Sequence, residues 1–311
     1  MDNQILGLHH ITAIATDAQI NYDFYTHILG QRLVKRTVNF DDPKTYHFYF
    51  GDEVGSPGSI LTFFPWEGMS RGKTGNGMAT EIGYAVNKQS KDFWLGRLNK
   101  FNIENMGFVE EFGNDVLKFE DPDGLKFSLV FTDQLMESTT WSTPEINPEM
   151  ATRGFHHVVL SLKSINATAS VLTGLLGYTL QAEHGQTSRF VNENASSSFI
   201  DLHEAPQGAY GQVAGGNIHH IAFQVRDESV LMAYREKIAR QGLNITEKID
   251  RDYFYSVYFR EPGGVLFELA TRNPGFSHDE PLSELGINLK LPRQYESMRA
   301  KITAQLPALK L

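Results

Sequence analysis

Paired histidines recur at the start of three similar segments of the chain. Six of the eleven histidines stand in these pairs, which occur in Leu8-His9-His10-Ile11, Phe155-His156-His157-Val158 and Ile218-His219-His220-Ile221. Neutral histidine is the commonest metal ligand in proteins near pH 7. A single His-His pair would carry little information, but its repeated placement before an apolar, strand-like run indicates a duplicated scaffold that binds a metal ion.

Glu268 is the carboxylate best placed to complete such a site. It stands in a strand-like apolar run whose alternate side chains should be buried, and a buried carboxylate needs a partner or a metal. An outward-facing position on an edge strand is the alternative interpretation. Two histidines and one carboxylate that leave other positions open suit Fe(II) oxygen chemistry. Because neighbouring side chains on a strand alternate, His10 and His220 can point into a shared cavity, while His9 and His219 point elsewhere or line its rim.

The segments around these residues are repeated too. From His10 to Gly30 and from His157 to Gly177 the spacing is 20 residues, and each interval holds a strand, a helix and a Leu-Gly stop. A second similarity relates residues 119–128 to 259–268 and residues 78–86 to 217–225. The repeats predict four units of strand, helix and several strands, which begin near residues 6, 77, 153 and 216.

Local patterns support this division. In the first unit, Asp17 is predicted to cap a helix that ends at Gly30, with Ile20, Phe24 and Ile28 on one face. Strands are predicted at residues 8–15, 32–39, 46–50, 59–64, 218–225, 253–260 and 265–271, and a helix at 229–241 with Val230, Tyr234 and Ile238 on one face. The polar stretch 133–149 is the natural linker, and residues from 273 onward lie outside the repeats.

Composition narrows the class of protein. The length of 311 residues favours about two domains. A net charge of −9 argues against nucleic acid as a partner. The absence of cysteine excludes disulfides, thiolate ligands and a cysteine nucleophile, so any metal must use nitrogen and oxygen ligands. We find no apolar run long enough to span a membrane and no signal segment at the start, so a cytoplasmic location is expected. A homo-oligomer is compatible with the sequence, which carries no signal for the oligomeric state.

The chain resembles the vicinal oxygen chelate superfamily, which includes glyoxalase and the type I extradiol dioxygenases and is built from βαβββ modules. Within it, the chain is most similar to the hydroquinone ring-cleaving dioxygenases. The segments that carry the resemblance are residues 7–12, 24–30, 33–39, 46–52 and 216–221, the Glu268 strand, and the tail motifs 279–281, 285–286 and 289–292. The single modules are shared widely, whereas their combination with the tail is much more specific.

The resemblance implies an α+β fold of four βαβββ modules paired into two domains. It implies an N-terminal domain at 1–145 with modules one and two, a C-terminal domain at 150–275 with modules three and four, and a tail at 276–311. It implies a metal held by His10, His220 and Glu268. The other matched site residues are His9, Thr12, His219, Arg251 and Tyr258. The expected metal is Fe(II); Mn(II) is also compatible, and Zn or Ni could occupy the site in a crystal. The expected partners are a small aromatic substrate and O2.

Rival ligand sets stay open. Catechol-cleaving relatives take all three ligands from modules three and four, which would replace His10 by His157. A second, degenerate pocket of modules two and three would contain Glu81, His157 and Asp201, because Glu81 aligns with His220 and Asp201 with Glu268. Phe48, Phe50, Phe63, Trp66 and Phe254 are candidate pocket walls or ordinary core residues.

Other functions of the same scaffold also stay open. A glyoxalase-type isomerase or lyase would use Ni(II) or Zn(II) without dioxygen. Glyoxalases commonly have a fourth ligand, but the position in module one that matches Glu268 falls near Thr62. A catechol substrate, or a non-catalytic protein that binds quinones or drugs, are the remaining alternatives.

Overall fold

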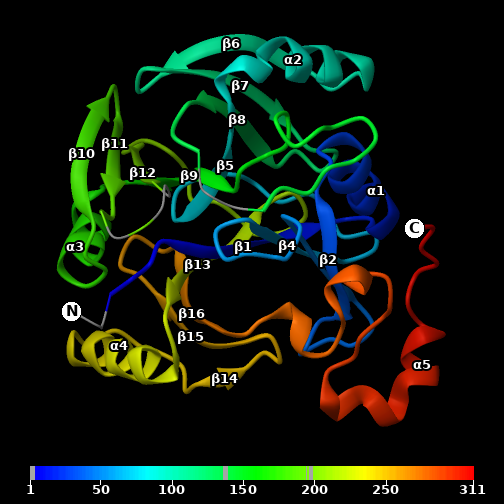
Figure 1. Ribbon diagram of the computed structural model, residues 1–311. Helices are drawn as coiled ribbons and strands as arrows, with labels where there is room; N and C mark the ends of the chain where they lie inside the picture. Colours follow the sequence, from blue (N-terminus) through cyan, green and yellow to red (C-terminus); the bar gives the residue numbers. More distant parts are fainter. Residues whose placement is uncertain (1–3, 136–138, 194, 196–198) are drawn as a thin grey trace.

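The protein forms two curled eight-stranded sheets, as shown by a computed structural model that describes residues 4–135, 139–193, 195 and 199–311 (Figure 1). The first sheet contains β1 (Leu8–Ala15), β2 (Arg32–Val38), β3 (Tyr46–Gly51), β4 (Ile60–Pro65), β13 (Ile218–Val225), β14 (Ile249–Asp250), β15 (Phe254–Arg260) and β16 (Leu266–Pro274). Their order is β14-β15-β16-β13-β1-β4-β3-β2. The sheet therefore joins the first and the fourth module.

The second sheet is formed by the two middle modules. It contains β5 (Met78–Asn87), β6 (Asn105–Glu111), β7 (Asn114–Glu120), β8 (Lys126–Thr132), β9 (Phe155–Leu162), β10 (Thr179–His184), β11 (Thr187–Val191) and β12 (Phe199–Glu204). Their order is β10-β11-β12-β9-β5-β8-β7-β6. In every module the first strand pairs in parallel with the last, β1 with β4, β5 with β8, β9 with β12 and β13 with β16. The predicted α+β fold of four βαβββ modules is confirmed.

Each sheet takes one module from each half of the chain. The modules meet through antiparallel first strands, β1 with β13 in one sheet and β5 with β9 in the other. A division of the chain at residues 145–150 thus separates modules one and two from modules three and four in the sequence. In space, however, strands from the two sides of this division are hydrogen-bonded to each other in both sheets. The two sheets share one apolar core, to which all four first strands contribute buried side chains.

Short helices connect the strands or follow the last strand. They are α1 (Ala18–Asp23), the π-helical turn η1 (Phe24–Ile28), η2 (Lys88–Ser90), α2 (Lys91–Lys100), α3 (Asn166–Gly174), α4 (Glu228–Arg240), η3 (Phe276–His278), η4 (Leu282–Glu284), η5 (Arg293–Met298) and α5 (Arg299–Thr303). Helix α4 packs against β15 and β16. The predicted apolar face of α4 is confirmed, because its buried residues include Val230, Tyr234 and Ile238.

The first helix differs from the prediction on one side chain. Asp17 caps it as expected, since its carboxylate accepts a hydrogen bond from the Ile20 amide. Ile20, however, is 51% exposed, so it is not buried with Phe24, which was predicted on the same face of the helix. The α-helical part is only six residues long and passes directly into the π-turn, where the Leu29 amide bonds to the Phe24 carbonyl five residues earlier. The Phe24 amide bonds to the Ile20 carbonyl in an ordinary helical turn, so the wider turn alters the placement of Ile28 and not that of Ile20.

The C-terminal tail packs along the outer edge of the first module. Leu289 forms an isolated bridge with Arg36 of β2, and the Tyr295 hydroxyl donates a hydrogen bond to the Phe40 carbonyl. The fully buried Lys35 ammonium lies 2.5 Å from Glu280 of the tail. In the described residues, no helix has the length and apolar character needed to cross a membrane.

Candidate metal centre

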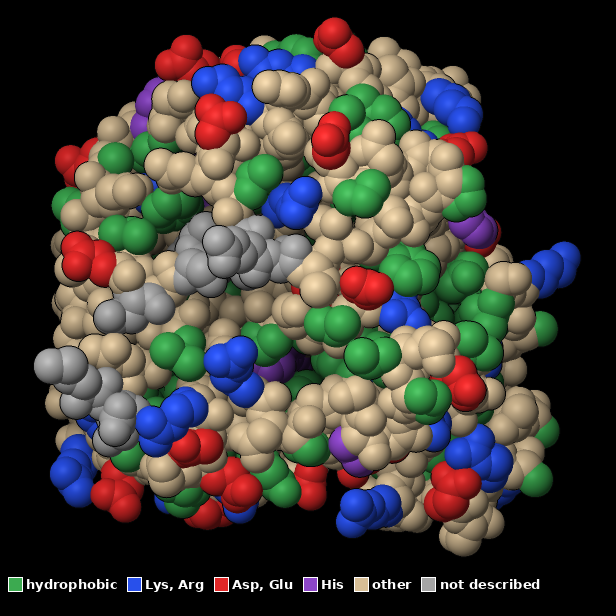
Figure 2. Space-filling model, viewed as in Figure 1, with side chains coloured by type: hydrophobic (Ala, Val, Ile, Leu, Met, Phe, Trp, Pro, Cys, Tyr) green, Lys and Arg blue, Asp and Glu red, His purple; other side chains and the backbone are tan. Residues whose placement is uncertain are grey.

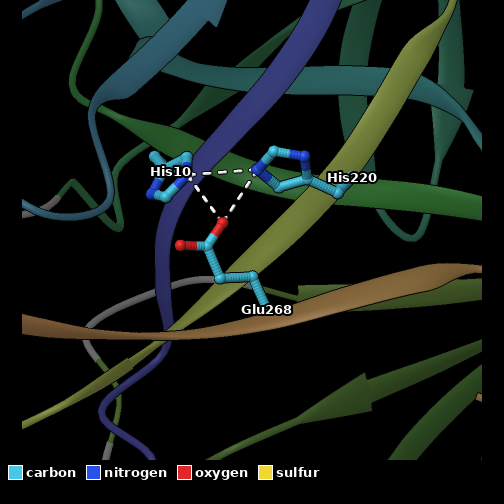
Figure 3. Close-up of side chains that lie close together, drawn as sticks. All are labelled: His10, His220 and Glu268. Carbon is cyan, nitrogen blue, oxygen red and sulfur yellow. Dashed lines mark hydrogen bonds and ion pairs between the residues drawn. The ribbon is translucent and has the colours of Figure 1, made fainter. Parts of the chain in front are cut away.

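His10, His220 and Glu268 converge on one point inside the first sheet (Figure 3). Glu268 Oε2 lies 3.2 Å from His10 Nε2 and 2.8 Å from His220 Nε2, and the two Nε2 atoms are 3.4 Å apart. All three side chains are buried. In the described part of the chain, this is the one group of three or more potential ligands close enough to share a metal ion.

Strand register explains why these three side chains meet. The central strand β13 pairs with β1 on one side and β16 on the other, and Ala222 of β13 is the partner of both His10 and Glu268. His220 precedes Ala222 by two residues, so its side chain lies on the same face. Three adjacent strands from two modules thus place one ligand each in a row across the sheet.

The first histidine of each pair holds the second in place. His9 Nδ1 lies 2.9 Å from His10 Nδ1, and His219 Nδ1 lies 2.8 Å from His220 Nδ1. Burial, with a further contribution from the neighbouring ring, lowers the pKa of both His9 and His219 to about 3, so both rings are neutral at pH 7. A neutral ring can accept the Nδ1–H of its neighbour, which leaves the Nε2 lone pair of the neighbour free for a metal.

The environment of Glu268 fits a bound cation. Its side chain is fully buried, and Oε1 has no hydrogen-bond partner among the described residues. Burial alone would raise the pKa of this carboxyl, but His10 and His220 outweigh it, and the pKa lies well below its usual range. His10 Nε2, His220 Nε2 and the Glu268 carboxylate face one another in a buried space, which is how donor atoms are arranged around a shared metal ion. The donor set therefore fits a divalent metal.

The fourth position around the centre carries no carboxylate. Thr62 occupies the place in β4 that matches Glu268, and its hydroxyl lies 2.9 Å from the Thr12 hydroxyl and 3.0 Å from His47 Nε2. His47 Nδ1 in turn lies 3.0 Å from the Tyr49 hydroxyl. These contacts satisfy Thr62 within the wall, so the protein offers three ligands and leaves the remaining positions open.

A cavity of about 440 Å³ lies beside the three ligands, and its wall holds most of the predicted site residues. Thr12, His219, Arg251 and Tyr258 all line it. Arg251 Nε donates a hydrogen bond to the Tyr258 oxygen at 3.3 Å. Burial, reinforced by the nearby Glu268 charge, raises the pKa of Tyr258, so the phenol keeps its proton at neutral pH. The space-filling view shows a hollow near the middle of one face with a histidine side chain inside (Figure 2).

His9 differs from the other predicted site residues. Only 3% of it is exposed, and it does not line the cavity. Its ring packs 5.1 Å from the ring of Phe254 and touches His10 through Nδ1. The geometry makes His9 a positioning residue for His10.

The aromatic wall was only partly predictable. Trp66 and Phe254 line the cavity, whereas Phe48, Phe50 and Phe63 are fully buried in the apolar core. Residues of β3 alternate between the two faces of the sheet, so the side chains that reach the cavity are His47 and Tyr49 instead. The sequence analysis did not identify His47 and Tyr49 as site residues. Their alternation with the apolar Phe48 and Phe50 along the strand would have indicated that they face the other side of the sheet.

The rival ligand set does not come together. Asp201 is held by the Arg189 guanidinium at 2.6 and 2.8 Å, and Glu81 lies 3.3 Å from the Lys118 ammonium. His157 Nε2 is 3.8 Å from the nearest Glu81 oxygen. These groups form ion pairs within the protein and do not converge as a ligand set. In the catechol-type alternative His157 would replace His10, but it is His10 that lies with His220 and Glu268.

Comparison with known proteins agrees with the fold and the site. The profile of the Glyoxalase/Bleomycin resistance protein/Dioxygenase superfamily matches residues 7–129 and 154–269. The chain is 42% identical to MhqO of Bacillus subtilis (strain 168), which is provisionally named a ring-cleaving dioxygenase, over 97% of this chain and 96% of that protein. It is 34% identical to the chlorohydroquinone/hydroquinone 1,2-dioxygenase of Sphingobium indicum, over 97% and 96%.

A solved structure is also very similar. A crystal structure of a provisionally named dioxygenase from Bacillus subtilis superimposes with a TM-score of 0.95 at 40% identity, over 99% of this chain and 98% of that one. The repeated match of the superfamily profile, one in each half of the chain, agrees with the four-module architecture. The chain belongs to the Glyoxalase/Bleomycin resistance protein/Dioxygenase superfamily.

Proposed function

We propose that this protein is an Fe(II)-dependent dioxygenase that opens the ring of a hydroquinone with both atoms of O2. The observation that carries the proposal is the open three-ligand centre of His10, His220 and Glu268 at the wall of a ring-sized cavity. A centre of two histidines and one carboxylate with free positions suits non-haem iron oxygen chemistry, while Mn(II) is compatible with the same ligands. The names of the relatives MhqO and the Sphingobium enzyme support the same reaction class.

The polar groups of the cavity match the needs of a hydroquinone. A bound Fe(II) would act as a Lewis acid on one ring hydroxyl and supply a binding position for O2. Arg251 carries a positive charge beside this position and would stabilise the phenolate form of the substrate. Tyr258 accepts from Arg251 Nε and keeps its own proton, so its O–H is free to donate to a substrate oxygen.

Two further residues would handle protons and orientation. His219 is neutral at pH 7 and partly exposed at the cavity wall, so one of its ring nitrogens can exchange a proton with bound substrate. Thr12 presents a hydroxyl on the same strand as His10 and is held by Thr62. Ring opening between the carbon that bears the coordinating hydroxyl and its neighbour would yield a semialdehyde acid, or first an acyl chloride if that neighbour carries chlorine.

Oxygen consumption tests the proposal. The protein is loaded anaerobically with Fe(II) and given methylhydroquinone, chlorohydroquinone or catechol in turn, and the products are identified. We expect uptake with a hydroquinone and a ring-opened product, abolished by His10→Ala and retained in His157→Ala, the matched change in the second sheet. Uptake confined to catechol would replace the hydroquinone assignment. Absence of uptake with all three, despite one bound metal per chain, would contradict the dioxygenase proposal.

A further inference from the structure

The cavity at the metal centre adjoins a second cavity. The second one has a volume of about 560 Å³ and shares four wall residues with the first, namely Trp66, His219, His220 and Leu266. Ligand His220 thus faces both spaces. A substituent of a molecule bound at the metal centre would reach the second cavity by passing between these shared side chains.

The second cavity has a different chemistry from the first. Its inner wall is formed by buried apolar residues that include Ile14 and Ile218, and its outer wall by Met69 and Val213 from two surface loops. Arg260 is the only charged side chain among the described residues of this wall. By contrast, the first cavity carries the hydroxyl, guanidinium and imidazole groups that a dihydroxylated ring needs.

A bare hydroquinone has no part that matches the second cavity. Both of its oxygens sit on one small ring, whose polar contacts are all offered in the first cavity. An apolar cavity that opens from a substrate site gains affinity from apolar substituents, because each methylene that leaves water contributes favourably. The wall therefore indicates which substituents the ring can carry.

We propose that the second cavity is a substituent subsite and that the preferred substrates are hydroquinones with an uncharged alkyl chain of several carbons. This inference rests on the proposed function for the identity of the ring and adds the class of substituent. A chain with a terminal ammonium is disfavoured, because it would have to lose its hydration in an apolar space near Arg260.

Anaerobic calorimetric titration of the Fe(II)-loaded protein tests the subsite by binding alone. The probes are hydroquinone and its methyl, propyl and pentyl derivatives, with an aminopropyl derivative as the charged control. We expect affinity to rise about two- to fourfold for each added methylene up to the pentyl chain. The aminopropyl compound should bind no better than hydroquinone itself.

Two variants locate the effect. Met69→Trp and Val213→Trp each fill the outer part of the second cavity, and Val213 is already 45% exposed, so its replacement is compatible with folding. Met106→Trp is the matched control, because Met106 is 83% exposed on β6 of the other sheet. We expect the chain-length dependence to flatten in the first two variants and to stay unchanged in the control, while hydroquinone binding stays equal in all of them.

Oxygen uptake with the same compounds separates this inference from the proposed function. Chain-dependent binding without uptake from any compound would contradict ring cleavage and support the subsite. Uptake from hydroquinone with a flat chain-length dependence would overturn the subsite and leave ring cleavage standing. A dependence that persists in both filling variants would also overturn it, because the chain would then lie elsewhere.

Discussion

The two sheets of this protein carry equivalent positions with different charge balance. In the first sheet His10 pairs with Ala222, and in the second sheet His157 pairs with Gly83. Ala222 and Gly83 are therefore equivalent positions. By the same register, Glu81 takes the place of His220, Ser128 that of Glu268, and Asp201 that of Thr62. One sheet therefore has one carboxylate and two histidines, whereas the other has two carboxylates and one histidine.

The second sheet neutralises its carboxylates with the protein's own cations. Lys118 pairs with Ser128 in β8 as Tyr258 pairs with Glu268 in β16, and its ammonium contacts Glu81. Arg189, opposite Asp201 in the ladder, binds that carboxylate through two nitrogens. In the first sheet the equivalent positions are held by uncharged phenols, so the buried negative charge of Glu268 is left for an external cation.

Gly83 explains a second difference. A Cβ atom at this position would lie 2.3 Å from ring atoms of His157, so the absence of a side chain lets that ring lean over β5. In the first sheet the Cβ atom of Ala222 fills the equivalent space, so the ring of His10 cannot take the same orientation. A few changes of charge and volume thus separate a candidate metal-ligand set from an internal ion-pair cluster on the same scaffold.

The largest expected effect separates the two carboxylates Glu268 and Glu81. Glu268→Gln removes the anionic ligand, so we expect metal content to fall from about one ion per chain to near zero and oxygen uptake to vanish. Glu81→Gln is the matched control in the second sheet and should leave both unchanged. Metal analysis after dialysis and oxygen-electrode assays measure the two. Equal metal loss in both variants would show that the sheets share the metal.

In the metal-free protein, a substitution in the second sheet should lower the free energy of unfolding more than a substitution of Glu268 in the first sheet. Asp201→Asn leaves the buried Arg189 without its anion, and loss of one partner of a buried ion pair costs about 3–5 kcal/mol. Glu268→Gln keeps the volume of the side chain and removes a carboxylate whose neighbours are two imidazoles rather than a guanidinium, so its cost should be smaller than that of Asp201→Asn. Urea unfolding after chelation compares them. A larger loss in the Glu268 variant would contradict our account of charge balance.

The positioning histidines give the next effect. His9→Phe removes the group that holds His10 Nδ1, and loss of such a partner typically lowers metal affinity about 10- to 100-fold. His156→Phe removes the same contact in the second sheet, where His156 Nδ1 lies 3.0 Å from His157 Nδ1. We expect no change in metal affinity there. Competition with a chromophoric chelator measures both, and a similar loss in the two variants would refute the assignment of roles.

Much of this architecture was readable in the sequence because the repeats and the alternation reinforce each other. The predicted bounds of β1 and β13 coincide with the observed ones, and the three predicted ligands converge. The sequence did not show that β1 would pair with β13 and so join modules one and four in one sheet, because strand pairing and register depend on contacts between distant segments. His47 and Tyr49 were missed since Phe48 and Phe50 dominate the apolar pattern of that strand. The exposure of Ile20 was not readable either, because its spacing from the buried Phe24 is that of one ordinary helical turn.

The smallest predicted effect is one that the two sheets should share. Burial, with the neighbouring ring second, depresses the pKa of His9 to about 3 and holds that of His156 well below its ordinary value of 6.5. Below pH 6.5 these histidines are protonated in the unfolded chain but stay neutral in the native protein. Their contribution to the free energy of unfolding is therefore present above this pH and is lost as the pH falls toward 3.

In metal-free protein each of these histidines should contribute a slope of at most about 1.4 kcal/mol per pH unit below pH 6.5. His9→Phe and His156→Phe should therefore reduce the acid sensitivity of the unfolding free energy by similar amounts, as measured by urea titrations at pH 7 and at about pH 5. Equal slopes beside unequal metal affinities would show that the His-His geometry is common to the scaffold, and that the charges around it decide which sheet binds metal. A change of slope in one variant only would show that the two pairs differ in more than their ligand role.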